Sequence, residues 1–180
     1  MNKYGLIFAG AQKNLGPSGV TIVIIRKDLA ERADKNLPTL LQYRTHIKEK
    51  SLYHTPPTFA VYIVGLVLEW IESEGGLQGM AKRNDAKAGL LYDAIESSGG
   101  FYSCPVEKAS RSKMNVVFRV AGGDDSLEKK FSVEAAAAGL VGTPGHRSVG
   151  GMRVSLYNAV GPAAVEALTS FMREFQRARG

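Results

Sequence analysis

The sequence is poor in the features that define several large classes of protein. It contains one cysteine, Cys104, among 180 residues, which excludes an intramolecular disulfide and a cysteine-based metal cluster. Its longest apolar run covers only residues 59–68, whereas a membrane-spanning helix needs about 20 apolar residues. The first ten residues have too little apolar content for a signal peptide. We therefore expect a cytoplasmic protein without a membrane segment.

Blocks of like charge are also absent, although the net charge is +6. No run of five or six basic residues occurs, and aromatic residues do not alternate with basic ones as they do in many nucleic-acid-binding surfaces. We therefore expect no nucleic-acid partner. Because the net charge is positive, a basic nucleic-acid binder is kept as a rival hypothesis. Hydrophobic residues make up 44% of the chain, which is enough for one core or two small ones.

A glycine pair, Gly75 and Gly76, ends a predicted helix over residues 57–74 and marks a domain boundary. Beyond it, helices and strands are predicted in alternation, at residues 77–98, 112–120, 124–139, 151–157 and 162–177. The third of these begins with Asp125 and Glu128 at the spacing of a capping box. The last has apolar residues on one face, namely Val165, Leu168, Phe171, Met172 and Phe175. This order predicts a small α/β or α+β domain.

The chain before the boundary begins with two predicted strands, residues 4–9 and 20–26. Both are apolar on both faces, so we expect them to be buried in a covered sheet. Asp28 is expected to cap a short helical turn after the second strand. Residues 35–55 show no period and are expected to form a long irregular segment of the kind that is often functional.

The loop between the two strands reads "AGAQKNLGPSG" and carries a single charge, on Lys13. A lysine amine is normally protonated at neutral pH and is then a poor nucleophile, but in a confined, partly dry loop it becomes reactive toward carbonyl groups. The small residues around it would let a flat ligand approach the backbone. The alternative is an ordinary solvated lysine in a turn.

Two arginines, Arg147 and Arg153, occur six residues apart in "GHRSVGGMRVS". In an extended segment this even spacing puts both side chains on one face, where they would suit a dianionic substrate. His146 adds a donor beside a phosphate. A bulge at Gly150 and Gly151 would break this parity, and the alternative is a pair of arginines on a solvated edge.

A second candidate anion site is the segment before the double proline, where His54 and Thr55 precede the predicted helix start. Helix N-termini attract anions through their unpaired N–H groups and the helix dipole. Simple N-capping by Thr55, with proline at the first helical position, is the alternative.

Four strings of the sequence, "YGLIFAGAQKNLGPSGVTIVI", "SLYHTPPTFAVY", "RSKMNVVF" and "GHRSVGGMRVSLYNA", resemble the phosphoserine aminotransferase family, which are pyridoxal-phosphate enzymes of fold type I. The resemblance implies that Lys13 forms the Schiff base with the cofactor and that Gln12 lies near the cofactor phosphate. It makes Thr55 a phosphate ligand contributed by the neighbouring subunit of a homodimer. His54 stands where the family has asparagine and remains a possible donor.

The resemblance further implies that His146 and Arg147 bind the phosphate of the substrate and that Arg153 binds its α-carboxylate. L-Glutamate would give its amino group to the cofactor, and 3-phosphohydroxypyruvate would receive it to become O-phosphoserine, in serine biosynthesis. Lys13 would also move the proton at the substrate α-carbon. Residues 1–74 would be the end of the large cofactor-binding domain, and residues 75–180 the small C-terminal α/β domain.

The resemblance covers only the back half of the family's chain. The family's phosphate-binding loop, ring-stacking aromatic residue and pyridine-pairing aspartate lie upstream and have no counterpart here. We therefore expect a fragment that needs the missing half from another polypeptide, and we keep a non-catalytic remnant or interaction module as the alternative. We also expect residues 77–180, but not residues 1–74, to fold independently.

Overall fold

The computed structural model describes residues 3–180 and divides into two compact units, one ending at Glu74 and the other beginning at Gly75. The break falls at the glycine pair, where Gly75 has φ 91° and Gly76 has φ 66°. Both values lie in the left-handed region that glycine adopts without a steric penalty. Among the helices of the described residues, none combines the length and apolar content that crossing a membrane requires.

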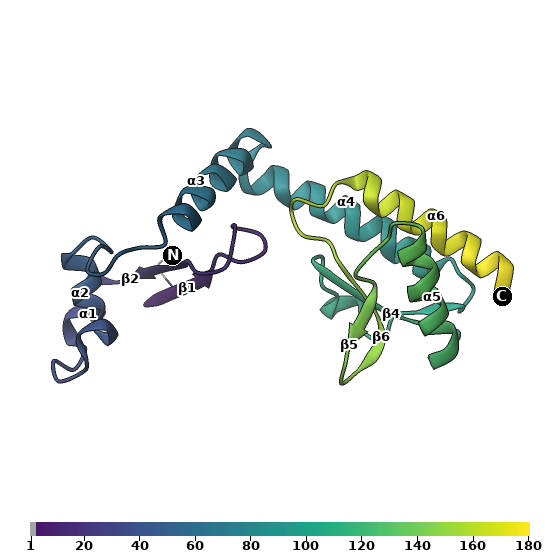
Figure 1. The fold of residues 1–180 in the computed structure, drawn as a ribbon, viewed down its shortest axis with the longest axis horizontal. Helices are drawn as coiled ribbons and strands as arrows, with labels where there is room; N and C mark the ends of the chain where they lie inside the picture. The colour runs from purple at the N-terminus through teal and green to yellow at the C-terminus, as the bar shows by residue number, and fades with distance from the viewer. Residues whose placement is uncertain (1–2) are drawn as a thin grey trace. The chain divides into compact units, whose positions relative to one another are not determined.

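The first unit begins with an antiparallel hairpin of β1 (Leu6–Gly10) and β2 (Thr21–Ile25), with Leu6 opposite Ile25 and Gly10 opposite Thr21 (Figure 1). The expectation that both strands are buried is wrong for this chain, because Phe8 is 71% exposed and Ile24 is 43% exposed. The apolar pattern was identified correctly, but no described element of this chain covers these faces.

Helices follow where an irregular segment was expected. The 3-10 turn η1 (Thr39–Leu41) and α2 (Tyr43–Lys48) lie within residues 35–55, so this segment is not structureless. The short helical turn expected before it is confirmed as α1 (Lys27–Arg32). Asp28 does not cap α1. Its carboxylate instead accepts hydrogen bonds from Arg26, at 2.9 and 2.7 Å. The arginine at the N-cap position competes for the carboxylate that would otherwise cap the helix.

Helix α3 (Thr58–Ser73) closes the first unit. Its N-cap residue is Pro57 and makes no side-chain capping bond, so the expectations of Thr55 as the cap and of proline at the first helical position are wrong. The chain stays non-helical through Pro56 and Pro57, because each proline disfavours a helical conformation in the residue before it.

The second unit contains three long helices, α4 (Gly76–Glu96), α5 (Asp125–Ala137) and α6 (Pro162–Arg179). They accompany a four-stranded antiparallel sheet of order β3-β4-β6-β5. Its strands are β3 (Tyr102–Ser103), β4 (Asn115–Val120), β5 (Pro144–His146) and β6 (Gly150–Ser155), with the 3-10 turn η2 (Lys108–Ser110) between β3 and β4. The expected mixture of helices and strands is confirmed, and the antiparallel order selects the α+β arrangement for this unit.

The core of the second unit lies between one face of this sheet and the helices (Figure 1). Along β4 every second residue is buried, with Val116, Phe118 and Val120 in the core. Phe131 of α5 and Phe175 of α6 pack into the same cluster, with their ring centroids 5.1 Å apart. The opposite face of the sheet carries the alternate residues of β4 and β6, among them Arg119 and Arg153.

A charged residue lies inside this unit. Lys87 of α4 is 1% exposed, and its Nζ donates to the carbonyl oxygens of Leu156, Tyr157 and Val160 at 3.1, 2.8 and 2.9 Å. Burial lowers the pKa of Lys87, with a smaller contribution from the charge of Arg83. The three carbonyl oxygens satisfy the ammonium group and fix the chain between β6 and α6.

Candidate active site

The lysine loop connects β1 to β2 and is closed by the bond from Ala11 N–H to the Val20 carbonyl, 2.8 Å long. Ala11 is fully buried, whereas Gln12 and Lys13 are exposed. Lys13 has φ 91°, a conformation that side-chain-bearing residues rarely adopt. Strained backbone of this kind clusters at functional sites, so the conformation of Lys13 supports a functional role.

The far side of the same loop packs against α3. A Cβ atom on Gly16, which has φ 146°, would lie 3.0 Å from Cγ2 of Val64. The loop is therefore held against a buried residue of the helix by a glycine whose conformation and contacts both disfavour a side chain. In this chain the amine of Lys13 is not in the confined, dry setting that the sequence suggested, because its residue is exposed.

His54 and Thr55 lie in an exposed segment between α2 and α3 that is neither helix nor strand. The helix begins three residues after Thr55, so the two side chains are not at its first turn, and the argument from a helix N-terminus does not apply to them directly. They remain accessible polar donors in the same unit as Lys13.

His146 and Arg147 lie where β5 turns back into β6. His146 pairs with Gly150, and the turn residues 147–149 project beyond the two strands. The Ser148 N–H donates to His146 Nδ1 at 3.3 Å, and the Ser148 hydroxyl lies 2.7 Å from the same atom. In the neutral ring this assigns the proton to Nε2, which is then a donor.

The expectation that Arg147 and Arg153 share one face of an extended segment is wrong, because the chain reverses direction between them. Gly150 and Gly151 have φ 76° and 71°, and β6 begins at Gly150. Arg153 lies opposite Val117 on the sheet face away from the core, about 10 Å along β6 from the turn at ~3.3 Å per residue. The two arginines thus belong to one hairpin, with Arg147 in its turn and Arg153 in its second strand.

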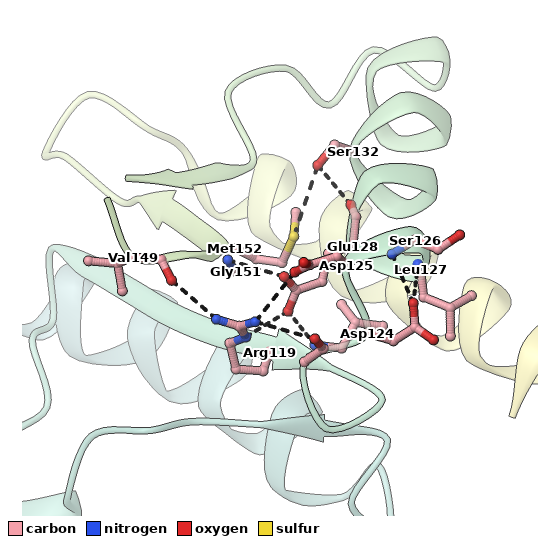
Figure 2. Close-up of polar contacts among 12 residues, drawn as sticks. Arg119, Asp124, Asp125, Ser126, Leu127, Glu128, Ser132, Val149, Gly151 and Met152 are labelled. Carbon is pink, nitrogen blue, oxygen red and sulfur yellow. Dashed lines mark hydrogen bonds and ion pairs between the residues drawn. The ribbon is translucent and has the colours of Figure 1, made fainter. Parts of the chain in front are cut away.

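Two residues that the sequence did not indicate as part of the site adjoin this hairpin, namely Arg119 and Glu128 (Figure 2). Glu128 of α5 is only 6% exposed and forms an ion pair with Arg119 of β4, 2.8 Å from Oε1 to Nε. The capping-box interpretation of Glu128 is wrong, since Asp124 is the N-cap and accepts from the N–H groups of Ser126 and Leu127 at 2.8 and 3.0 Å. The spacing of Glu128 to the buried Phe131 and Ala135 was the signal that it faces inward.

A family model, Aminotransferase class-V, matches residues 1–168. The chain belongs to the class-V aminotransferase family. The family resemblance expected from the four sequence strings is thereby confirmed.

Individual proteins are closely similar to this chain. The phosphoserine aminotransferase of Lysinibacillus sphaericus is 59% identical over 177 residues, which are 98% of this chain and 48% of that protein. The solved phosphoserine aminotransferase from Bacillus circulans subsp. alkalophilus has a TM-score of 0.95 and 55% identity, covering 99% of this chain and 49% of its own. This chain therefore spans about half the length of the relatives it matches.

A solved structure of lower sequence identity is described as binding PLP. It is that of a PLP-bound phosphoserine aminotransferase from Trichomonas vaginalis, with a TM-score of 0.89 and 40% identity over 96% of this chain and 48% of that chain. The expected fold is confirmed by these likenesses, and the roles of the individual site residues remain predictions.

Proposed function

We propose that this chain supplies the lysine-bearing half of a phosphoserine aminotransferase. The enzyme would transfer the amino group of L-glutamate to 3-phosphohydroxypyruvate, giving 2-oxoglutarate and O-phosphoserine for serine biosynthesis. The observation that carries the proposal is the 59% identity to a phosphoserine aminotransferase over 98% of the chain. The strained, exposed Lys13 on its hairpin loop supports it independently.

The residues present fit pyridoxal 5′-phosphate by their chemistry. Lys13, an exposed residue, has the amine that the aldehyde requires, and three further exposed residues have hydrogen-bond donors for the phosphate, namely Gln12, His54 and Thr55. When bound, this cofactor supplies an electron sink that stabilises negative charge at the substrate α-carbon. The amine of Lys13, once exchanged for the substrate amine, would move the proton from that carbon to the cofactor, and in the opposite direction in the second half-reaction.

The substrate would be held by the hairpin of the second unit. Arg153 would pair with the α-carboxylate that glutamate and O-phosphoserine share, since a guanidinium binds a carboxylate through two parallel N–H bonds. His146 and Arg147 would bind the phosphate that only O-phosphoserine and its keto acid carry. The backbone bond at Nδ1 leaves the Nε2 proton of His146 for donation in the neutral ring.

We further propose that the enzyme is a cytoplasmic homodimer in which Thr55 serves the cofactor of the neighbouring subunit. The single cysteine suits a reducing compartment.

A second candidate, that this chain by itself is a non-catalytic module, is supported by the apolar surface of its first unit. Phe8, Phe59 and Tyr62 are each more than 60% exposed there, which is typical of a surface that another polypeptide covers.

The proposal is tested by substituting Lys13 in a fusion enzyme, which we define as this chain joined to the part of the L. sphaericus relative that it does not span. We expect transamination between glutamate and 3-phosphohydroxypyruvate in the fusion enzyme, and its loss in both Lys13→Ala and Lys13→Arg. The guanidinium of the second variant keeps the charge but does not form the imine. The complete L. sphaericus enzyme is the positive control.

Near-normal turnover in either Lys13 variant would contradict the assignment of this residue. An inactive fusion enzyme that is folded and dimeric would contradict the proposed activity. The unfused chain, assayed with added pyridoxal phosphate, tests the second candidate, because robust turnover without another polypeptide would exclude a module that is inactive alone.

A further inference from the structure

The strands β4 and β6 separate at the end that leads to the turn at residues 147–149. Their last register pair is Phe118 with Met152. If the ladder continued, Arg119 would lie opposite Gly151. Instead, the carboxylate of Glu128 lies between the two strands and accepts hydrogen bonds from the backbone of both. Its Oε1 accepts the Val120 N–H at 3.3 Å and its Oε2 accepts the Gly151 N–H at 3.1 Å. One buried side chain of α5 thus joins the two strands where their own ladder ends (Figure 2).

Arg119 extends this junction to the turn itself. Its Nε pairs with Glu128, its Nη1 donates to the carbonyl oxygen of Val149 at 3.3 Å, and its Nη2 donates to that of Gly123 at 3.4 Å. Asp125 lies 3.9 Å from Nη2 but is largely exposed, so it adds little. The planar fork of a guanidinium can serve three directions at once, which an ammonium group at the same place cannot do in the same geometry.

The start of β6 is shaped to receive this arginine. Gly151 has φ 71°, and a Cβ atom on it would lie 2.9 Å from Cδ of Arg119 and 3.1 Å from the Phe118 carbonyl oxygen. On the adjoining strand, a Cβ atom on Gly145 would lie 2.1 Å from the carbonyl oxygen of Gly150. The backbone is therefore closely packed on both sides of the turn, against Arg119 on one side and against the neighbouring strand on the other.

We infer that Arg119 and Glu128 are positioning residues for the phosphorylated substrate: the pair fixes the turn that presents His146 and Arg147. Neither residue contacts the substrate in this assignment. Arg153 lies further along β6, where the ladder to β4 is intact, so its position depends less on the pair. The inference rests on the proposed function, because it takes His146 and Arg147 as the phosphate ligands.

The test compares two conservative variants of the fusion enzyme with a matched control. Arg119→Lys keeps the charge beside Glu128 but cannot make all three contacts, and Glu128→Gln keeps the shape but replaces an acceptor with a donor. Asp124→Ala is the control, because it removes the N-cap of the same helix and destabilises it without touching the turn. Each protein is assayed in the two half-reactions separately, with O-phosphoserine and with L-glutamate.

We expect the KM for O-phosphoserine to rise roughly 10- to 100-fold in both variants, as small displacements of a binding group can cause, while the KM for glutamate stays unchanged. The Asp124→Ala protein should lose thermal stability without this selective effect. Equal losses for the two substrates, or no loss for either, would overturn the inference. Should Glu128→Gln fail to fold, Arg119→Lys decides the question by the same criteria.

Amide hydrogen exchange separates failure of this inference from failure of the proposed function. Exchange at residues 147–151, measured relative to the amides of residues 115–118 in the same protein, should be faster in Arg119→Lys and Glu128→Gln than in Asp124→Ala. Unchanged exchange would show that the pair does not hold the turn, whatever the activity. Faster exchange in an enzyme that never accepts O-phosphoserine would instead overturn the proposed function and, with it, the assignment of a phosphate to this turn.

Discussion

Arg147 and Arg153 are close in sequence but differ in the structure that fixes each backbone. Arg153 is in the middle of the sheet, where its own N–H donates to the Thr143 carbonyl at 2.9 Å. Arg147 is in a three-residue turn whose geometry depends on side chains from other elements. A strand position that is hydrogen-bonded on both sides tolerates change better than a turn does. The proposed α-carboxylate site at Arg153 should therefore be more robust than the proposed phosphate site.

The proposed division of substrate contacts between these arginines predicts different selectivities. In the fusion enzyme, Arg153→Ala should weaken both glutamate and O-phosphoserine, because both carry an α-carboxylate. Arg147→Ala should weaken O-phosphoserine more, since only this substrate carries a phosphate. A lost charge-assisted contact costs about 1.5–3 kcal/mol, or roughly 10- to 100-fold in kcat/KM. Half-reaction kinetics with each substrate measure this, and equal losses in the Arg147 variant would refute the division.

At the scale of elements, the end of α4 is tied to the segment around η2 by charge. Glu96 pairs with Arg111 and with Lys108, the latter at 3.1 Å, and the Arg111 guanidinium lies 4.8 Å from the ring centroid of Tyr92. The hydrogen bond from Arg111, followed by that from Lys108, lowers the pKa of the Glu96 carboxyl from its usual value near 4.5. These ion pairs connect the end of α4 to a segment whose regular structure is the short 3-10 turn η2.

The lowered pKa of Glu96 makes this connection sensitive to acid. Since folding lowers the pKa of Glu96, its contacts with Arg111 and Lys108 stabilise the folded protein fully above pH 4.5. This contribution is lost as the pH falls through the pKa that Glu96 has in the folded protein. Glu96→Gln should therefore lower the melting temperature at pH 7, and the difference from the parent should shrink below pH 4.5. Asp93→Asn, a change on the same helix at a residue with no described ion pair, should not show this pH dependence.

Elements with a strong local pattern were predictable, and those that depend on distant partners were not. Helix α6 follows from its apolar stripe, and of the five residues expected on it only Phe171 is partly exposed. Strands β3 and β5 have two and three residues, too few for any period to appear in the sequence. The site shows the same contrast: the residue types of the hairpin suggested an anion site, but its reversal and the inward-facing Glu128 depend on packing between elements.

At the scale of the molecule, the two units differ in how much core they contain. The contiguous buried cluster, from Ala88 to Phe175, belongs entirely to the second unit. The buried apolar residues described in the first unit are few, namely Ala11, Ala30, Val64 and Ile71. Many of its large apolar side chains are instead exposed, including those of the β1–β2 hairpin and of α3. The second unit thus has the core that an independent fold needs, and the first does not.

This difference predicts the behaviour of the separated units. A polypeptide of residues 75–180 should unfold cooperatively in urea, with a far-UV circular dichroism spectrum of mixed helix and strand. A polypeptide of residues 1–74 should show no cooperative transition, because a lone two-stranded hairpin and its short helices are marginal in water. Cooperative unfolding of the shorter piece would contradict this, as would a structureless longer piece.

The three carbonyl oxygens around Lys87 have a chemical consequence. An amine-reactive acylating reagent reaches only lysines that solvent reaches, so Lys82, exposed on the same helix, should be modified quickly in the native protein while Lys87 is spared. Acylation of Lys87 can then occur only after the chain between β6 and α6 has released its ammonium group. Mass spectrometry of the Lys87 peptide over time, with the Lys82 peptide as the internal reference, would report how often the second unit opens; acylation of both lysines at equal rates would show that this burial is not kept in solution.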